Sequence, residues 1–405
     1  MPKRKECASI IQYKQLTYGD NTAEEDICYL KKKSKKEQTE LLSELSFLHT
    51  MTSSLVPLMF RLLESPIPQP FKMIAYKKML ALDNDPSGKI QQWIDAFLRI
   101  PFQKGIPLSV SSDQIDKCQS FLKDCELILD KCTYGMKDAK NQFMQLIGKW
   151  IVNPDSMGTA IALKGPMGTG KTTLIKHGIS KILNRAFAFI TLGGASDGSF
   201  LEGHSFTYEG STYGKIVDIL IQTKTSNPVI FFDELDKVSQ SEKGNEIIGI
   251  LTHLIDSTQN TQFHDKYFSE LDFDLSKCLF VFSYNDESLV NPILKDRMFT
   301  IEISGYDKQE KIIIARDYLI PEIEKEYRMS DILWKDTLLE YLIEKTDEES
   351  GVRNLKRSLD TIYSKLNLIR IVDLSFVFPY EITRDKIDEW FPTLQVSSNY
   401  SSMYL

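Results

Sequence analysis

Residues 165–172 read GPMGTGKT, and this spacing of glycine, lysine and threonine is suited to holding a chain of phosphates. Glycines let backbone N–H groups turn toward phosphate oxygens with no Cβ in the way. Lys171 would reach the β- and γ-phosphates, and the Thr172 hydroxyl would ligate Mg²⁺. The strand-like TAIALK precedes the loop and the helical TTLIKHGISKIL follows it, so a helix N-terminus adds partial positive charge. The pattern predicts a site for ATP and Mg²⁺ formed by Gly165, Pro166, Met167, Gly168, Thr169, Gly170, Lys171, Thr172 and Thr173.

An acidic pair ends a second apolar segment, PVIFFDE at 228–234. Asp233 is placed to hold the Mg²⁺, and Glu234 to take the proton of an attacking water molecule. Acidic residues after a strand also serve as helix N-caps. A phosphate loop earlier in the same chain favours the catalytic interpretation.

Two further polar residues fall where such a site needs them. The strand-like LFVFSYN closes on Asn285, whose amide is suited to orient the attacking water. Arg297 follows Asp296 and precedes the apolar MFTIEIS, a position from which it can complete the phosphate site of a neighbouring subunit. The alternative for Arg297 is a surface ion pair with Asp296, and the sequence alone does not separate the two.

These residues need a sheet to bring them together, and five short apolar segments supply its strands. They lie at 159–165, 187–192, 227–234, 277–285 and 298–304, with helical stretches between them. Several are apolar throughout, as in a parallel sheet that is covered on both faces. The predicted fold class is therefore α/β, with a parallel phosphate-loop sheet between helical layers.

Helical periodicity before and after the sheet predicts further parts of the chain. We expect a polar basic tail, a helical N-terminal region, the phosphate-loop domain, a second helical region that closes with a strand and a helix, and a C-terminal tail, at 1–36, 37–131, 132–304, 305–391 and 392–405. We interpret residues 1–36 as a solvated, mobile tail. Its basic runs, PKRK and KKKSKK, are also compatible with a nuclear address or a nucleic-acid contact.

Composition argues against several classes of protein. The net charge is −7, so the whole molecule has no electrostatic footprint for nucleic acid. No apolar run is long enough for a membrane span or a signal peptide, so we expect an intracellular protein, cytoplasmic in preference to nuclear. Cys118, Cys125 and Cys132 repeat every seven residues in a helical stretch. That spacing separates neighbouring thiols by about 10 Å, which favours a packed stripe over a metal site.

Residues 131–357 resemble the AAA+ ATPase module of Lon-type ATP-dependent proteases. The similar segments follow the family's order and include KCTYGMKDAKNQFMQLIGKW, GPMGTGKTTL, ITLGGASDGSFLEGHSFTYEGSTYGKI, NPVIFFDELDKVS, STQNTQFHDKYFSELDFDLSKCLFVFSYND, LVNPILKDRMFTIEISGYDKQEK and SGVRNLKR. Upstream, KIQQWIDAFLRIPF is more weakly similar to the helical segment that precedes this module in Lon. The resemblance implies an AAA+ domain followed by a helical lid, an active ATPase, and a ring of subunits that we expect to be a hexamer.

The resemblance also implies roles for single residues. Asn285 matches the position called sensor 1, and Arg297 in KDRM matches the arginine finger. Arg353 in GVRNL matches sensor 2, which reaches from the lid to the γ-phosphate. Tyr134 in TYG matches a tyrosine beside the adenine, although Thr133 stands where the family has histidine.

In the family, a loop matching GHSFTYEGS grips polypeptide in the central pore of the ring. Tyr208 keeps the aromatic residue of that loop, whereas Glu209 stands where an aliphatic residue is usual. An aromatic ring grips a chain through apolar contact, and a neighbouring carboxylate weakens that grip on apolar segments. Tyr213 is a second candidate for grip. The alternative for Tyr208 is packing between subunits.

Only PTLQVSSNYSSMYL follows the strand and helix that close the lid, so we expect no serine–lysine peptidase domain and no peptidase activity. The function expected is ATP-driven remodelling or unfolding of polypeptide, with a separate peptidase as a candidate partner. One alternative is a nucleic-acid-directed ATPase, which the basic runs favour and the net charge disfavours. The other is an ATP-switched assembly platform that docks its partner through residues 37–131.

Overall fold

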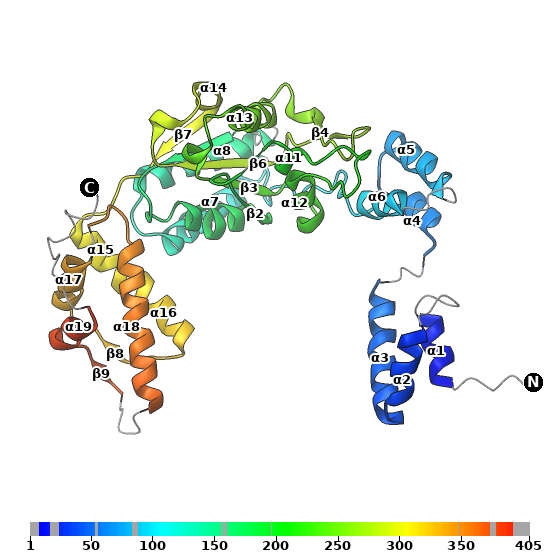
Figure 1. The fold of residues 1–405 in the computed structure, drawn as a ribbon. Helices are drawn as coiled ribbons and strands as arrows, with labels where there is room; N and C mark the ends of the chain where they lie inside the picture. Colours follow the sequence, from blue (N-terminus) through cyan, green and yellow to red (C-terminus); the bar gives the residue numbers. More distant parts are fainter. Residues whose placement is uncertain are drawn as a thin grey trace, which may run out of the picture. The chain divides into compact units, whose positions relative to one another are not determined.

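The computed structural model describes residues 8–16, 24–52, 56–82, 88–154, 156, 160–195, 197–346, 348–372 and 378–391. The chain divides into two units, residues 1–98 and residues 99–405 (Figure 1). No helix in these described ranges is long and apolar enough to cross a lipid bilayer.

The first unit is helical. Its helices are α1 (Ala8–Leu16), α2 (Glu24–Lys32), α3 (Lys35–Thr52), α4 (Leu58–Glu64), α5 (Gln69–Met79) and α6 (Lys89–Phe97). Helix α1 lies against α3, and α5 lies against both α4 and α6. The buried residues include Leu62, Ala75, Trp93 and Phe97.

The prediction that residues 1–36 are a mobile tail is wrong for the part that the structure describes. Two helices form there, and they bury Ile10 and Leu30. The lysine run KKKSKK ends α2 and begins α3, where the backbone N–H of Ser34 donates to Glu37 Oε2 over 2.9 Å. Apolar residues were too sparse among the charges for the sequence to indicate this packing. The PKRK run and the predicted C-terminal tail at 392–405 lie outside the described residues.

A five-stranded parallel sheet forms the centre of the second unit, and all five predicted strands are confirmed. They are β1 (Ala160–Lys164), β2 (Phe187–Thr191), β3 (Val229–Asp233), β6 (Leu279–Tyr284) and β7 (Met298–Glu302). The strand order is β2-β3-β6-β1-β7, and every neighbouring pair is parallel. The register pairs Lys164 with Tyr284 and Thr191 with Asp233, so the strands end at a common edge. The residues that follow β1, β3 and β6 therefore meet there.

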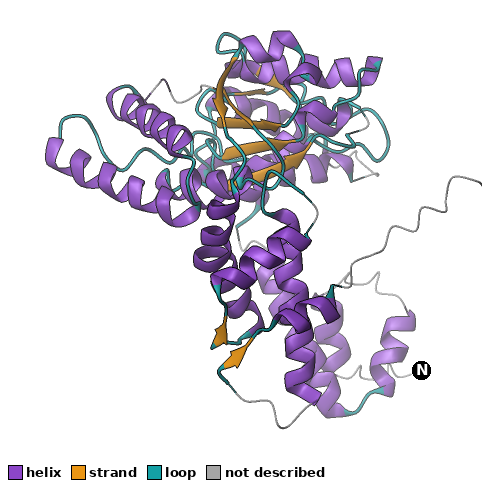
Figure 2. Cartoon of the chain, turned by 90° about the vertical axis from the view of Figure 1, so that its left-hand side faces the viewer, coloured by secondary structure: helices purple, strands orange, loops and turns teal. Residues whose placement is uncertain are grey.

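Helices cover the sheet, and shorter elements connect the strands (Figure 2). These helices are α7 (Ile115–Cys132), α8 (Lys137–Val152), α9 (Lys171–Thr173), α10 (Ser180–Ile182), α11 (Ser199–Glu202), α12 (Lys215–Thr223), α13 (Glu242–Ile255) and α14 (Pro292–Asp296). A π-helical segment, Leu174–Ile179, joins α9 to α10. A small antiparallel pair consists of β4 (Phe263–His264) and β5 (Asp272–Phe273).

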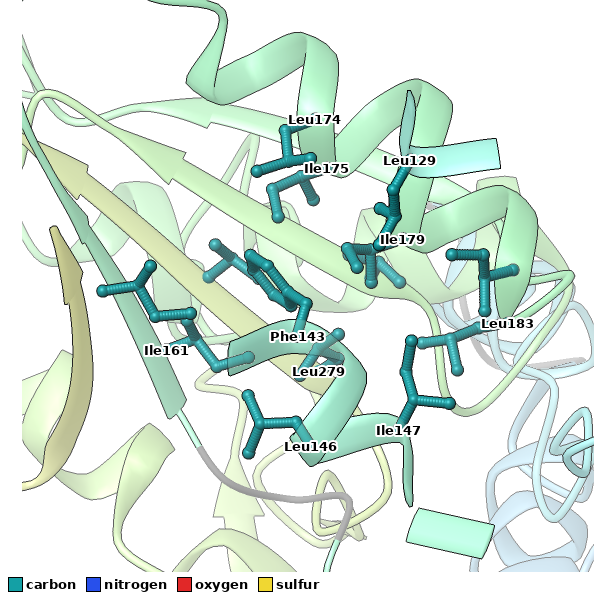
Figure 3. Packing of buried hydrophobic residues seen from close by; sticks show 14 of the residues in the cluster. Leu129, Phe143, Leu146, Ile147, Ile161, Leu174, Ile175, Ile179, Leu183 and Leu279 are labelled. Carbon is teal, nitrogen blue, oxygen red and sulfur yellow. The ribbon is translucent and has the colours of Figure 1, made fainter. Parts of the chain in front are cut away.

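The core beneath the sheet places α7 in the second unit. Leu129 of α7 and Phe143 of α8 pack with Ile161 of β1 and with Ile175 and Ile179 after the phosphate loop (Figure 3). Helical periodicity assigned 37–131 to one N-terminal region, but the structural boundary lies at residue 98. Periodicity shows that a stretch is helical and does not show what the helix packs against. The cysteine stripe is confirmed as packing, since Cys125 is fully buried in this core.

A helical lid follows the sheet and has a core of its own. Its elements are α15 (Lys308–Ile314), a π-helical segment (Ala315–Leu319), α16 (Ile320–Tyr327), β8 (Ile332–Leu333), α17 (Asp336–Lys345), α18 (Arg353–Val372), β9 (Tyr380–Glu381) and α19 (Arg384–Trp390). Leu339, Leu359 and Ile387 are fully buried in its core. A capping box between Asp307 and Glu310 fixes the first turn of α15, and the lid therefore begins at a defined residue. The predicted closing strand and helix correspond to β9, which pairs with β8, and to α19.

Candidate functional site

A cavity of about 740 Å³ lies at the edge where the strands end. The lid closes one side of it, because Val352 and Arg353 belong to its lining. Most of the residues predicted for the nucleotide site line this cavity, namely Tyr134, Met167, Gly168, Thr169, Gly170, Lys171, Thr172, Thr173, Asp233, Glu234, Asn285 and Arg353. Gly165 and Pro166 lie at the base of the loop, while Arg297 and Tyr208 lie elsewhere in the unit.

The phosphate loop runs from β1 to α9, and two of its glycines are required by its geometry. Gly170 caps α9 with φ 93°, a left-handed conformation that side chains rarely adopt. A Cβ on Gly165 would lie 2.2 Å from the carbonyl oxygen of Ile303. The loop can therefore pass close to the end of β7 only with glycine at this position.

Lys171 is the cation at the floor of the cavity. Its Nζ donates to the carbonyl oxygens of Gly165 and Pro166, over 2.5 and 2.8 Å, and to Asn285 Oδ1 over 3.0 Å. The side chain is buried, and burial lowers the pKa of Lys171 to about 8, against the opposing effect of Asp233 and Asp236. All three acceptors are uncharged, so phosphate oxygens would be stronger partners for the ammonium group.

The acidic pair Asp233 and Glu234 lies at the end of β3, and its two carboxylates have different surroundings. Asp233 Oδ1 accepts hydrogen bonds from the Ser283 hydroxyl and from the backbone N–H of Glu234. Glu234 has φ 60° and ψ 46°, a left-handed conformation that is uncommon outside glycine and concentrated at functional sites. A Cβ on Gly193 would lie 2.2 Å from Glu234 Oε2. The absence of a side chain at Gly193 therefore leaves room for the Glu234 carboxylate.

Asp236 was not predicted from the sequence, yet it fixes the loop that carries Asn285. It is 6% exposed, and its Oδ2 accepts the backbone N–H groups of Asn285 and Asp286 over 3.2 and 3.1 Å. Asp236 is separated from Asn285 by 49 positions and from Asp286 by 50 positions in the sequence. A contact over that separation leaves no local sequence pattern that would predict it. Asp236 thus orients the backbone from which the Asn285 amide reaches Lys171.

Apolar and aromatic side chains also line the cavity. Ile128, Ile314 and Leu319 line it together with Tyr134, whose ring meets that of Tyr318 edge to face at 6.3 Å between centroids. A cavity lined both by phosphate-binding groups and by apolar and aromatic side chains suits a nucleotide, with its charged chain and flat base.

Arg297 does not line the cavity of its own chain. It ends α14, with its side chain 37% exposed, and its Nε forms an ion pair with Asp256 Oδ2 over 3.3 Å. The partner is therefore Asp256, not the Asp296 considered from the sequence. One of its terminal nitrogens also donates to the carbonyl oxygen of Ile293 over 3.2 Å.

The loop that carries Tyr208 projects from a buried base. Tyr208 is 68% exposed at its tip. At the base, the fully buried Asp265 accepts the backbone N–H of Gly214 over 2.7 Å. Tyr213, the second predicted candidate for grip, instead packs its ring against Tyr267 and Phe268, with both centroids at 6.0 Å. Tyr213 therefore belongs to the base of the loop and not to its exposed tip.

Comparison with known proteins agrees with this geometry. The model of the family "ATPase family associated with various cellular activities (AAA)" matches residues 161–306. The chain is 36% identical over 354 residues to a Lon protease homolog of Acanthamoeba polyphaga mimivirus, covering 84% of this chain and 34% of that protein. It is 37% identical over 282 residues to Lon protease of Fusobacterium nucleatum, covering 69% and 35% of the two chains. The chain carries an AAA+ ATPase module of the Lon type.

This Lon-type module also matches the mitochondrial Lon protease homolog of Scheffersomyces stipitis, with 36% identity over 299 residues, 73% of this chain and 26% of that protein. The chain thus spans about a third or less of the length of the curated relatives it matches. AAA modules are ATPases that bind a nucleotide together with a divalent metal ion.

The residues of the Lon-type module fit such an ion. Thr172 and Asp233 both line the cavity and supply a hydroxyl and a carboxylate. Within the described ranges, no three His, Cys, Asp or Glu side chains gather into a metal site by themselves. The hydroxyl of Thr172 and the carboxylate of Asp233 suit an ion such as Mg²⁺, which takes one or two protein ligands and completes its shell with phosphate oxygens and water.

Proposed function

We propose that the module hydrolyses ATP to ADP and phosphate, with Mg²⁺, and uses the energy to move polypeptide through a ring of subunits. The observation that carries the proposal is the convergence of Lys171, Asp233, Glu234, Asn285 and Arg353 on one cavity. These residues come from the phosphate loop, two neighbouring strands and the lid. Each has the chemistry that one part of the reaction requires.

The proposed roles follow from position and chemistry. Loop N–H groups and Lys171 bind the phosphate chain, while Thr172 and Asp233 would hold Mg²⁺, which neutralises charge on the phosphates. Glu234 accepts the proton of the attacking water, and Asn285 orients that water. Arg353 extends from the start of α18 and would contact the terminal phosphate. Tyr134 is placed for the base.

Arg297 supports assembly into a ring, which we propose to be a hexamer. Its guanidinium is exposed and lies outside its own cavity. In a ring, that group would complete the site of the neighbouring subunit and stabilise the charge of the transition state.

The exposure of Tyr208 supports polypeptide as the substrate. A ring of exposed tyrosines gives a grip that tolerates different sequences, because it depends on apolar contact with any chain. The relatives are named as proteases, which act on polypeptide. A separate peptidase is a candidate partner, and the compartment we propose is intracellular, with no support from the relatives for a nuclear address.

The first test is steady-state ATP hydrolysis by the purified protein, alone and with a permanently unfolded polypeptide. We expect polypeptide to stimulate hydrolysis and Glu234→Gln to reduce it by about 10²–10⁴. Glu242→Gln, at an exposed glutamate on α13, is the matched control. Hydrolysis by Glu234→Gln at the wild-type rate would overturn the assignment of the reaction.

The proposal that the Tyr208 loop grips polypeptide is tested with two variants in the same assay. Tyr208→Ala should remove the stimulation and keep basal hydrolysis, whereas Tyr76→Ala, at a tyrosine of α5 that is 45% exposed, should keep both. Equal stimulation of Tyr208→Ala and wild type would exclude the loop as the grip.

One observation favours a second candidate, a nucleic-acid-directed ATPase. The turn between α2 and α3 presents exposed Lys31, Lys32, Lys35 and Lys36. DNA is therefore added as a third arm of the assay. Stimulation by DNA alone, which weakens steeply with salt, would replace polypeptide by nucleic acid as the substrate.

A further inference from the structure

Tyr306 lies at the hinge between the sheet and the lid, in the short segment that joins β7 to α15. Its hydroxyl donates a hydrogen bond of 2.8 Å to the carbonyl oxygen of Thr169, in the centre of the phosphate loop. The same hydroxyl lies 3.5 Å from the carbonyl oxygen of Tyr134. Burial raises the pKa of Tyr306, so the hydroxyl remains protonated and can donate.

The bond to Thr169 has a consequence for the next residue. A peptide unit is planar and trans, so the C=O of Thr169 and the N–H of Gly170 point in opposite directions. With the carbonyl held by Tyr306, the Gly170 N–H is turned away from the hinge. Gly170 lines the cavity and caps α9, where the backbone N–H groups have no partner within the helix.

Other loop carbonyls accept hydrogen bonds from two parts of the chain. Those of Gly165 and Pro166 accept from Lys171, inside the loop itself. The carbonyl of Gly168 instead accepts the backbone N–H of Val352, over 3.1 Å, from the turn before α18. The central carbonyls, of Gly168 and Thr169, are thus fixed by the lid and the hinge.

Tyr306 is tied to that same turn of the lid. Its backbone N–H donates to the carbonyl oxygen of Ser350 over 2.9 Å. A Cβ on the neighbouring Gly305 would lie 2.8 Å from the same oxygen, so the approach is close. Tyr306 therefore contacts the phosphate loop through its hydroxyl and the lid through its backbone N–H.

We propose that Tyr306 is a positioning residue of the nucleotide site, whose hydroxyl orients the Thr169–Gly170 peptide so that the Gly170 N–H faces the phosphates of a bound nucleotide. The hinge and the lid turn then take part in phosphate binding without touching the phosphates. This inference rests on the proposed function only in requiring that the cavity binds a nucleotide.

The test compares Tyr306→Phe with Tyr363→Phe in the full chain. Tyr363 is a buried tyrosine of the lid whose hydroxyl donates to Glu324 Oε1 over 3.1 Å and which does not line the cavity. Both changes remove one hydroxyl that donates a hydrogen bond and keep the ring. The readouts are the Kd of ADP, the Kd of GDP, the KM and kcat of ATP hydrolysis, and the melting temperature.

We expect Tyr306→Phe to weaken ADP binding about tenfold, which corresponds to one hydrogen bond to a charged phosphate. The KM for ATP rises by a similar factor and kcat stays within about threefold, since the N–H contributes to binding before and during the reaction. The ratio of GDP to ADP affinity is unchanged. Tyr363→Phe binds ADP as wild type does.

Three results would overturn the proposal. The first is ADP binding by Tyr306→Phe within twofold of wild type. The second is an equal loss in Tyr363→Phe, which would mean general loosening of the lid. The third is a changed GDP to ADP ratio, which would place the effect at the base, through Tyr134. A wild-type protein that binds no ADP would contradict the proposed function instead.

Discussion

Lys171 and Asn285 are joined by a hydrogen bond of 3.0 Å, from Nζ to Oδ1, between residues 114 positions apart. The bond connects the start of the helix after β1 with the residue that follows β6. With Oδ1 held by Lys171, the amide N–H groups of Asn285 are left to donate to a water molecule or a phosphate oxygen. Asp236 fixes the backbone of Asn285 by accepting its N–H group over 3.2 Å.

Asn285→Ala should separate binding from hydrolysis. The variant keeps the loop carbonyls as acceptors for Lys171, so ADP binding should stay within about threefold of wild type. The kcat should fall by about 10²–10³, the effect of losing one preorganised polar group at a reacting centre. ADP titration and steady-state kinetics measure the two. An unchanged kcat would limit Asn285 to holding the lysine.

Gly193→Ala should displace the Glu234 carboxylate without unfolding the protein. The added Cβ would lie 2.2 Å from Glu234 Oε2, at the end of a side chain that can move. Hydrolysis should fall by at least about tenfold, because a general base acts only within hydrogen-bond reach. ADP affinity and melting temperature should change little. The control is Gly249→Ala in α13, where a Cβ meets nothing within 4 Å.

Arg297→Ala should act on the neighbouring subunit. We expect hydrolysis to fall by about 10³ or more and ADP binding to persist, since Arg297 does not line its own cavity. Mixing Arg297→Ala with Glu234→Gln subunits should restore part of the activity, because some interfaces then pair an intact Arg297 with an intact Glu234. Mixtures no more active than either variant alone would contradict a role in trans.

Asp265→Asn should loosen the base of the Tyr208 loop. Asp265 accepts three backbone N–H groups, from Gly214, Tyr267 and Phe268. The asparagine side chain has one acceptor oxygen and one NH₂ donor. If the oxygen keeps the bonds to Tyr267 and Phe268, the NH₂ group faces the N–H of Gly214 and cannot accept from it. We expect faster amide exchange across residues 203–214 and reduced stimulation by polypeptide, with basal hydrolysis unchanged. Wild-type exchange in this loop would show that Asp265 does not hold it.

The same carboxyl makes stability depend on pH. Burial raises the pKa of Asp265 to about 6, so folding favours its protonated form between its ordinary value near 4 and pH 6. Its contribution to the free energy of unfolding should therefore fall as pH rises through this window, by about 3 kcal/mol at most. The melting temperature of wild type minus that of Asp265→Asn should decrease from pH 4.5 to 6.5. A constant difference would show that Asp265 does not titrate in this range.

The sheet and the loop residues were predictable because their signals are local. Each strand is a short apolar run, and the loop is a contiguous pattern of residues 165–172. Asp233 and Asn285 were predictable for the same reason, since each closes an apolar run. The parallel register then brings these ends together without further information.

Tyr306 and Asp236 carry no such signal. The hydroxyl of Tyr306 reaches a carbonyl 137 residues earlier. Asp236 accepts backbone N–H groups, which nearly every residue type has, so the residue types at 285 and 286 do not reveal the contact. The position of α7 was misjudged for a related reason. Its helical pattern is the same whether Leu129 packs against an N-terminal region or, as it does, against the sheet.

The contacts of Val352 and Tyr306 bear on how short an active fragment of this protein can be. The family match ends at residue 306, yet the carbonyl of Gly168 and the backbone N–H of Tyr306 find their partners at 352 and 350. A fragment cut at the end of the match would keep every residue of GPMGTGKT and Tyr306 itself, but it would lose the N–H of Val352 that holds the Gly168 carbonyl and the carbonyl of Ser350 that holds Tyr306. The smallest piece that retains the phosphate cradle therefore extends through the lid, whose core is completed only at α19.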